Sequence, residues 1–249
     1  MENGALAELA GVGSLSQSLA EALHARIVSG AIPLGSWLRQ DALALDFGIS
    51  RTPVREALQL LHGQGIVEIV PHRGAVVRGP TPRDVRENCE VRAELEGFAA
   101  ELAAMRIRDD QMARLIEARD AFEQLVEQVI ASHRAERDFQ RLAKQWAATN
   151  ERFHSTVLAA ADNNQLTASV LDLAARFPRN MSFQVLWGNS RQVRANAEEH
   201  AAIAAAILDR DGPGARVAVR DHMLNAGMLL SRWYENEVWS KADVRGARL

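Results

Sequence analysis

Apolar residues recur every three or four positions along most of this 249-residue chain, which predicts a mainly α-helical protein. The first helix is expected to open at Ser18, where the sequence Ser-Leu-Ala-Glu has the pattern of a capping box. Leu19, Leu23 and Ile27 would then form one apolar face, and Gly30 would end the helix. Most of the fold is therefore expected to form by packing of helices on their apolar faces.

Residues 40–58 predict two short helices joined by a tight turn. Ala44 is a small residue at the point where the two helices would touch, and Val54 is an apolar anchor inside the second helix. Gly48 can end the first helix with a positive φ, and Pro53 would lie in the first turn of the second helix, where its missing N–H costs nothing. This is the pattern of a helix-turn-helix, which reads DNA with its second helix.

Two β-branched runs, 66–70 and 75–77, interrupt the helical pattern. They predict a β-hairpin whose tip, residues 71–74, contains a histidine and an arginine. A basic hairpin after a helix-turn-helix forms a wing that can reach an adjacent minor groove. Arg51 and Arg55 lie four apart near the start of the second helix and share one face, where base edges and phosphates would be contacted.

The rest of the chain carries helical patterns and no strand pattern. Apolar stripes follow 91–102, which includes Val91 and Phe98, then 112–126 and 142–158, and further helices are predicted over 165–176, 193–209 and 215–238, with 211–214 separating the last two. We expect an N-terminal winged helix-turn-helix, built of three helices and a β-hairpin wing, followed by an all-α helical-bundle domain. The expected division is a flexible N-terminus at 1–14, the winged domain at 15–78, a linker at 79–82, the bundle at 83–238 and a C-terminal tail at 239–249.

Charge restricts how such a domain would bind nucleic acid. The chain has a net charge of −3 and a pI of about 6.2, and residues 15–78 hold six basic against five acidic residues, a net of +1. Binding must therefore be local, through the arginines of the second helix and the wing. The single Cys89 excludes an internal disulfide, and the absence of a signal peptide or a membrane-spanning apolar run favours a cytoplasmic protein without a membrane partner.

Three histidines are predicted to lie on three different helices of the bundle, each beside apolar core residues: His154, His200 and His222. Asn150 precedes His154 by four positions, so both project from one helix face. A histidine on a core face needs a partner for each ring nitrogen, and one divalent metal ion can satisfy several at once. Separate core histidines, each hydrogen-bonded to a neighbour, are the alternative that the spacing leaves open.

The segment 23–77, above all the string Ser-Arg-Thr-Pro-Val-Arg-Glu-Ala-Leu at 50–58 with the wing at 71–75, resembles the winged DNA-binding domain of the GntR family of bacterial regulators. The resemblance implies DNA contacts from the start of the recognition helix and from the wing. The residues at those positions are Ser50, Arg51, Thr52, Arg55, His72, Arg73 and Gly74. Some members carry a DNA-contacting arginine where this chain has Asp41, whose carboxylate would repel phosphate, so either Arg39 takes that role or the contact is absent.

The bundle resembles the ligand-sensing helical domain, called FCD, of the FadR-type branch of the same family. The similarity covers roughly 83–235 and rests on the strings at 150–154, 162–164, 199–200 and 221–222. It implies a divalent ion, Zn²⁺ or Ni²⁺, that is held by Asn150, His154, His200 and His222. Many members have an aspartate at the position of Asn150, and a neutral amide oxygen is a weaker ligand, so we expect weaker metal binding than an aspartate site would give.

The two resemblances together imply a transcriptional regulator, of the repressor type, that binds a palindromic double-stranded DNA operator as a homodimer. They also imply that a small organic or sugar acid takes the open positions of the metal and changes DNA binding. Arg92, on the first bundle helix, is expected to hold a carboxylate of that effector with its guanidinium. An exposed arginine paired with Glu96, four residues on, is the alternative for Arg92.

Two other functions remain open on the sequence. A metal ion could activate water in a hydrolase-like enzyme fused to a DNA-binding domain, which would need a general base nearby. The candidates Glu151 and Glu199 adjoin ligand histidines in sequence, so each would point about 100° away around its helix. No further feature supports catalysis, and we therefore expect a protein that is not an enzyme. A metal-free structural or interaction bundle would follow if the three histidines shared no pocket.

Overall fold

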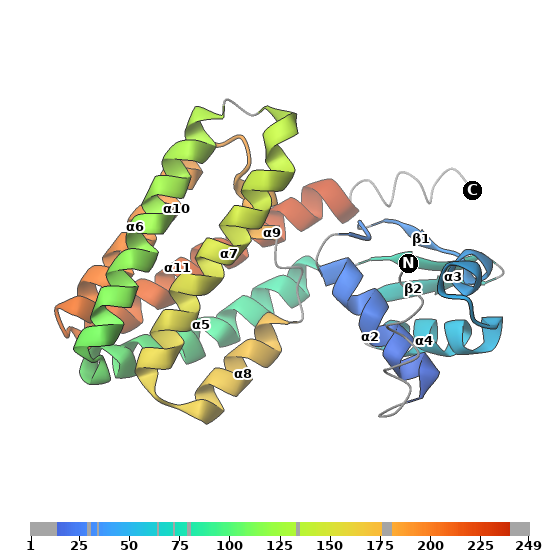
Figure 1. The fold of residues 1–249 in the computed structure, drawn as a ribbon, viewed down its shortest axis with the longest axis horizontal. Coiled ribbons are helices and arrows are strands. Elements are labelled where there is room, and N and C mark those ends of the chain that lie inside the picture. Colours follow the sequence, from blue (N-terminus) through green and yellow to red (C-terminus); the bar gives the residue numbers. More distant parts are fainter. Residues whose placement is uncertain are drawn as a thin grey trace. The chain divides into compact units, whose positions relative to one another are not determined.

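The computed structural model describes residues 14–28, 31–33, 35–63, 65–71, 73–78, 81–132, 135–175 and 181–239. The chain divides into two compact units, one made of the residues up to Thr81 together with those from Tyr234, and the other of Pro82–Trp233. Helices dominate the described residues, and the strands among them all lie in the first unit (Figure 1). The predicted fold class, mainly α with a winged helix-turn-helix before an all-α bundle, is confirmed.

The first unit is a small winged domain. Its elements in chain order are α2 Leu15–Val28, β1 Trp37–Leu38, α3 Gln40–Phe47, α4 Arg51–Gly63, β2 Val67–Val70 and β3 Gly74–Val77. The helix α2 begins earlier than the sequence pattern predicts, because the hydroxyl of Ser14 accepts the N–H of Gln17 at 3.3 Å and so provides the cap one turn ahead of Ser18. Ser18 itself is buried inside the helix.

The turn between α3 and α4 has the predicted geometry. Gly48 closes α3 in the left-handed region, with φ of 66° and ψ of 32°. Val54 is fully buried and lies with Leu58 and Leu61 on the inner face of α4. These residues pack against the apolar face of α2 and against the sheet, so α4 is held with its opposite face toward solvent.

The strands form one antiparallel sheet in the order β1-β3-β2. Strands β2 and β3 are the predicted hairpin, with Val67 opposite Val77 and Val70 opposite Gly74. The sequence pattern does not predict β1, because two residues are too few to show alternation. Gly74 has a φ of 112°, and a Cβ there would lie 2.5 Å from the carbonyl oxygen of Leu38, so the wing can pack against β1 only with glycine at this position.

The second unit is a helical bundle. Its elements are α5 Pro82–Arg106, α6 Asp109–Ala131, α7 Glu136–Ala161, α8 Asn164–Ala174, α9 Met181–Leu186, α10 Ser190–Leu208 and α11 Gly212–Trp233, after which the chain continues into a π-helical segment, η1 Tyr234–Trp239. Helices α5 and α11 lie side by side (Figure 1). Gly227 permits this approach, since a Cβ there would lie 2.5 Å from the Cβ of Cys89. None of the described helices is long and apolar enough to cross a membrane.

An aromatic cluster supports the interior of the bundle beside the three histidines. The rings of Phe122 and Trp146 meet edge to face at 4.7 Å, and Phe183 packs against Trp146 at 5.5 Å. Phe122 also stacks on the ring of His200 at 4.2 Å. A second apolar cluster, rich in alanines of α5, includes Phe153, whose ring meets His200 edge to face at 4.8 Å. Aromatic rings of both clusters therefore pack against His200.

The last part of the bundle differs from the sequence-based expectation in two places. The pattern does not predict α9, which has six residues and is too short to show a helical period. Residues 211–214 were expected to separate the last two helices, but α11 already begins at Gly212. Asp211 caps this helix by accepting the N–H of Gly214 at 2.9 Å, and Pro213 lies in the first turn, where no N–H is required.

The apolar stripe predicted over 91–102 is only partly buried. Ala99 and Leu102 lie in the core, but Val91 and Phe98 are 50% and 40% exposed. Periodicity alone assigns these residues to the core, because a helix with apolar residues on two sides gives the same pattern as a helix with one broad apolar face. Met105 is exposed too, so Val91, Phe98 and Met105 form an exposed row with seven-residue spacing along α5.

Candidate functional site

Three histidines from three helices meet at one point of the bundle. His154 lies on α7, His200 on α10 and His222 on α11, and one ring nitrogen of each lies within 4.8 Å of the others. His200 and His222 are buried, and His154 is partly buried. Three imidazole nitrogens that converge in this way could hold a divalent metal ion.

Hydrogen bonds orient two of the rings. His200 donates from Nδ1 to the carbonyl oxygen of Asn196 at 2.7 Å, and His222 donates from Nδ1 to Oε2 of Glu199 at 2.7 Å. Because an oxygen atom engages Nδ1 of both rings, Nε2 is the nitrogen left to face a metal. A carbonyl or carboxylate behind the ring is the usual support of a metal-binding histidine. Glu199 is itself held by the amide of Asn225 at 2.9 Å.

Asn150 faces the same point. Its Oδ1 lies 3.2 Å from Nε2 of His200. Both atoms are acceptors when Nδ1 of His200 carries the proton, so they repel one another unless a cation lies near both or the amide turns its NH₂ group toward the ring. A donor set of three imidazoles and one amide oxygen suits a divalent transition metal, and the residues present therefore fit the ion that the sequence predicts.

Burial keeps two of the rings neutral. Burial, and then the neighbouring His222 and Arg92, lowers the pKa of His154 well below its ordinary value. Burial, and then His222 and His154, lowers the pKa of His200 in the same direction, against the opposing effect of the hydrogen bond to Asn196. A neutral imidazole is the form that binds metal, so these two rings need lose no proton before an ion enters.

A buried carboxylate connects the histidines to Arg92. Glu96 is 4% exposed and accepts from Nε and Nη2 of Arg92 at 2.9 and 2.8 Å, both through Oε1. Its other oxygen, Oε2, lies 3.6 Å from Nδ1 of His154. Arg92 is paired with Glu96, as one of the two sequence-based alternatives states, but its side chain is 21% exposed and lies at the cavity rather than on an open surface.

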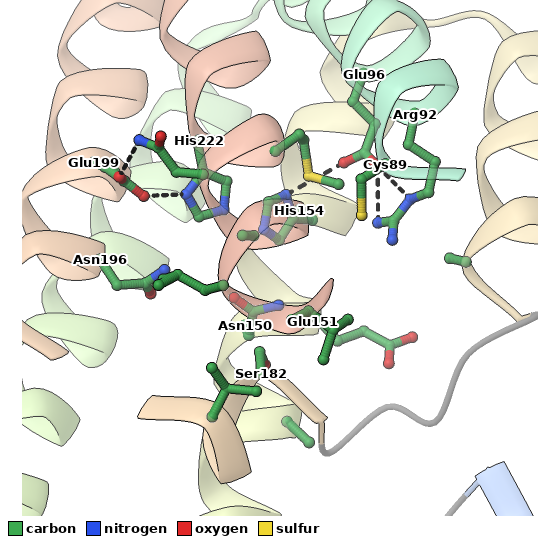
Figure 2. A pocket seen from close by; sticks show the side chains of 18 of the residues that line it. Cys89, Arg92, Glu96, Asn150, Glu151, His154, Ser182, Asn196, Glu199 and His222 are labelled. Atoms are coloured by element: carbon green, nitrogen blue, oxygen red, sulfur yellow. Dashed lines mark hydrogen bonds and ion pairs between the residues drawn. The ribbon is translucent and has the colours of Figure 1, made fainter. Parts of the chain in front are cut away.

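A cavity of about 620 Å³ opens beside the histidines (Figure 2). Its wall includes Arg92, Asn150, His154 and His222 together with apolar residues of α7, α8 and α11. A space of this size accommodates a small organic molecule. Three of the four side chains predicted to hold the metal therefore face the same space as Arg92, whereas the buried His200 is not part of the cavity wall.

Two residues of the cavity wall each have one buried polar atom that lacks a hydrogen-bond partner among the residues that the structure describes. These atoms are the indole Nε1 of Trp146, which is a donor, and Oδ1 of Asn196, which is an acceptor. A buried polar atom without a partner is costly, so water or a polar ligand is expected to satisfy it. A hydroxyl group can serve both kinds of atom, because it donates and accepts.

The recognition helix α4 presents its polar start to solvent. Ser50, Arg51, Thr52 and Arg55 are all exposed, in keeping with their predicted role in DNA contacts. Asp41 lies at the start of α3, and its Oδ1 lies 2.9 Å from Nε of Arg51, with side chains 75% and 67% exposed. The Asp41 carboxylate therefore pairs with an arginine predicted to touch DNA.

The wing residues lie near the start of α3. Gly74 packs against the backbone of Leu38 and Arg39, since a Cβ at Gly74 would lie 3.3 Å from the Cα of Arg39. Arg39 is exposed and occupies the position before α3, and Arg73 is exposed at the tip of the hairpin. The predicted contact residue His72 lies outside the described residues.

The three histidines, Asn150 and Arg92 could be found from the sequence. The contacts by which Glu96, Asn196 and Glu199 hold the histidines could not. Glu199 precedes His200 in sequence, yet it supports His222 on the neighbouring helix. Glu96 appeared only as a surface partner of Arg92, and its contact with His154 joins two helices. The available sequence signal is a carboxylate within one helical turn of a candidate pocket residue, as Glu96 and Glu199 both are. This pattern is too common in helices to identify such residues.

Comparisons with known proteins agree with this architecture. Residues 15–77 match the family described as bacterial regulatory proteins, gntR family, and residues 87–225 match the FCD domain family. An uncharacterized HTH-type transcriptional regulator in the TAR-I ttuE-ttuC' intergenic region of Agrobacterium vitis is 35% identical over 163 residues, which are 63% of this chain and 88% of the relative.

Two further relatives are named as repressors. A probable D-xylose utilization operon transcriptional repressor of Paenarthrobacter nicotinovorans is 34% identical over 140 residues, 56% of each chain, and the gluconate operon transcriptional repressor of Bacillus subtilis is 43% identical over 79 residues, 32% of each chain. The solved structure of E. coli McbR/YncC has the same fold, with a TM-score of 0.61 and 24% identity over 90% of this chain and 100% of that one. The chain therefore belongs to the GntR family of bacterial regulators, carries an FCD domain, and is a transcriptional regulator.

Proposed function

We propose that the protein is a dimeric repressor whose bundle holds a divalent ion and a small carboxylate effector. The proposal rests on the convergence of His154, His200 and His222 at one point of the bundle. Two of these histidines, His154 and His222, also line a cavity whose wall includes Arg92. An ion held by three imidazoles and the amide of Asn150 keeps open positions, which a carboxylate of the effector can take. The guanidinium of Arg92 then holds another part of the same molecule.

The donor set favours Zn²⁺ or Ni²⁺, which imidazole ligands suit. The amide of Asn150 contributes no formal charge, so the ion is bound less tightly than it would be with an aspartate. When bound, the ion supplies a positive centre at one end of the cavity. The protein residues do the rest: Glu199 and the carbonyl of Asn196 orient two rings, and Glu96 holds Arg92 at the wall.

The cavity chemistry supports a small organic or sugar acid as effector. A sugar acid offers a carboxylate to the ion and further polar groups to Arg92 and to the polar residues of the wall, which include Gln192 and Ser182. One relative is named for the gluconate operon, and gluconate is an acid of this kind. The enzyme alternative gains no support, because Glu199 is engaged with His222 and Asn225 and the relatives are regulators.

A homodimer on a palindromic operator follows from the size of the DNA reader. One recognition helix contacts only a few base pairs, and pairing of two copies on a two-fold site supplies affinity and register. The exposed row Val91, Phe98 and Met105 on α5 offers an apolar surface for that pairing. Seven-residue spacing keeps the three side chains on one side of the helix.

Effector binding reaches the DNA reader through α5. This helix begins at Pro82, directly after the winged unit ends at Thr81, and it carries both Arg92 and Glu96. A displacement of α5 on filling of the cavity is therefore passed along the chain to the winged unit. Such coupling between two sites changes DNA affinity by a factor set by the difference in effector affinity between the two conformations.

The DNA-binding half is tested by alanine substitution on the recognition helix. An operator selected by the protein from random double-stranded DNA is labelled, and binding is followed by fluorescence anisotropy at moderate salt. Arg51→Ala and Arg55→Ala should each abolish specific binding while circular dichroism and the oligomeric state stay unchanged. Retained specific affinity in both variants would overturn the assignment of α4 as the reader.

A further inference from the structure

We propose that Glu96 couples the effector to the metal, because the same buried carboxylate holds both Arg92 and His154. The proposal rests on the proposed function, in which Arg92 binds the acid and His154 binds the ion. It assigns to Glu96 a positioning role: its side chain transmits the arrival of an acid at Arg92 to the histidine that holds the ion. Metal and acid would then each strengthen the binding of the other.

The contacts of Glu96 divide between its two oxygens. Oε1 accepts both bonds from Arg92, at 2.9 and 2.8 Å, whereas Oε2 faces Nδ1 of His154 at 3.6 Å. Figure 2 shows Glu96 between the two, with dashed lines to each. The contact to Arg92 is tight and the contact to His154 is longer than a normal hydrogen bond. Without an acid, the Glu96 carboxylate therefore interacts mainly with Arg92.

A buried carboxylate cannot lose its partner without finding another. Glu96 is 4% exposed, so water cannot compensate a weakened contact with Arg92. An acid that shares the guanidinium draws Arg92 away from Oε1, and Nδ1 of His154 is the donor on the other side. A shorter contact between Glu96 and Nδ1 makes Nε2 of His154 a stronger ligand, because a carboxylate that accepts from the far nitrogen raises the basicity of the ring. The affinity for the metal rises as a result.

The bundle contains a matched control. Glu199 stands behind His222 as Glu96 stands behind His154, but its contacts are Nδ1 of His222 at 2.7 Å and the amide of Asn225 at 2.9 Å. It supports a ring without contacting the arginine that is proposed to hold the acid. Loss of the Glu199 charge should therefore weaken metal binding, whereas loss of the Glu96 charge should remove the part of the coupling between metal and acid that passes through Glu96.

The experiment measures Zn²⁺ affinity by competition with a chromophoric chelator, without acid and with D-gluconate or acetate as the probe. In the wild type, the acid should raise Zn²⁺ affinity by about 5- to 150-fold, the usual range of coupling between two sites. The ratio of the Zn²⁺ affinities with and without acid measures the coupling. Glu96→Gln should still bind both partners, with this ratio reduced to the part that direct contact between acid and ion provides. Glu199→Gln should lose about 10- to 100-fold in Zn²⁺ affinity and keep the wild-type ratio.

A second variant keeps the test independent of the folding of Glu96→Gln. Arg92→Ala frees Glu96 for His154 permanently, so its Zn²⁺ affinity without acid should already exceed that of the wild type, and acid should not change it. The proposal is overturned if Glu96→Gln keeps the wild-type ratio, if Arg92→Ala gains no Zn²⁺ affinity, or if neither acid alters the Zn²⁺ affinity of the wild type. A wild type that binds neither Zn²⁺ nor acid would overturn the proposed function as well, whereas binding of both, with a wild-type ratio that Glu96→Gln retains, would overturn only the coupling through Glu96.

Discussion

Removal of the Asp41 carboxylate should strengthen DNA binding. In the free protein Asp41 pairs with Arg51 at 2.9 Å, and both side chains are largely exposed. An exposed pair of this kind is worth about 0.2–1 kcal/mol, so DNA must displace a weak contact before it can use the guanidinium. Asp41→Asn should therefore raise operator affinity by about 1.5- to 5-fold from this term alone, with a further gain from the lost repulsion of phosphate.

The assay is fluorescence anisotropy with a labelled operator over a range of salt concentrations. The gain from Asp41→Asn should be largest at low salt, because ions screen both the pair and the phosphates. Asp46→Asn is the matched control: it makes the same charge change in the same unit, but Asp46 pairs with Arg26 of α2 at 3.4 Å. Equal gains in the two variants, or a loss of affinity in Asp41→Asn, would show that Asp41 does not compete with DNA for Arg51.

The remaining predictions concern the metal and the dimer. His200→Ala and His222→Ala should each lose the bound ion in elemental analysis of the purified protein, and unchanged metal content in both would exclude the site. Chelation of the wild type should lower the melting temperature by about 5–10 °C if the ion was at 100 times its Kd, because it binds only the folded state. Asn150→Asp should raise the affinity for the ion, since a carboxylate adds a formal negative charge to the ligands. A lower affinity in this variant would contradict the role of Asn150 as a ligand. Phe98→Glu should give monomers in sedimentation while keeping helicity, and a retained dimer would place the interface elsewhere.

The winged unit could be predicted closely from sequence because its signals are local. Gly48 and Val54 each have a role that depends on neighbouring residues in the sequence, and the two β-branched runs lie only a few residues apart. Two features of this unit were not predicted, and both have local reasons. Strand β1 has only two residues, and Ser14 and Ser18 offer the same capping hydroxyl one turn apart. Which of the two serines caps α2 depends on how far the helix is extended by packing against the rest of the unit.

The bundle site could be predicted in its residues but not in its geometry. The helical spacing of Asn150 and His154 is local, whereas the meeting of His154 with His200 and His222 depends on how α7, α10 and α11 pack. Family resemblance, rather than spacing, pointed to that meeting. The contacts that hold the histidines in place could not be predicted. Glu96 on α5 contacts His154 on α7, and the sequence pattern does not show which residues of two different helices will meet.

We propose that a metal ion and an acid in the bundle together control DNA binding, and this can be tested by measuring operator affinity. Operator affinity is measured for the metal-loaded protein with and without each member of a panel of organic and sugar acids, then again after chelation and with Arg92→Ala. At least one acid should change the operator affinity of the metal-loaded wild type by about 5- to 150-fold, and operator DNA should change the affinity for that acid by the same factor. The chelated protein and Arg92→Ala should bind the operator without responding to the acid. A metal-loaded wild type that responds to no acid in a broad panel, or an Arg92→Ala variant that responds like the wild type, would contradict the account.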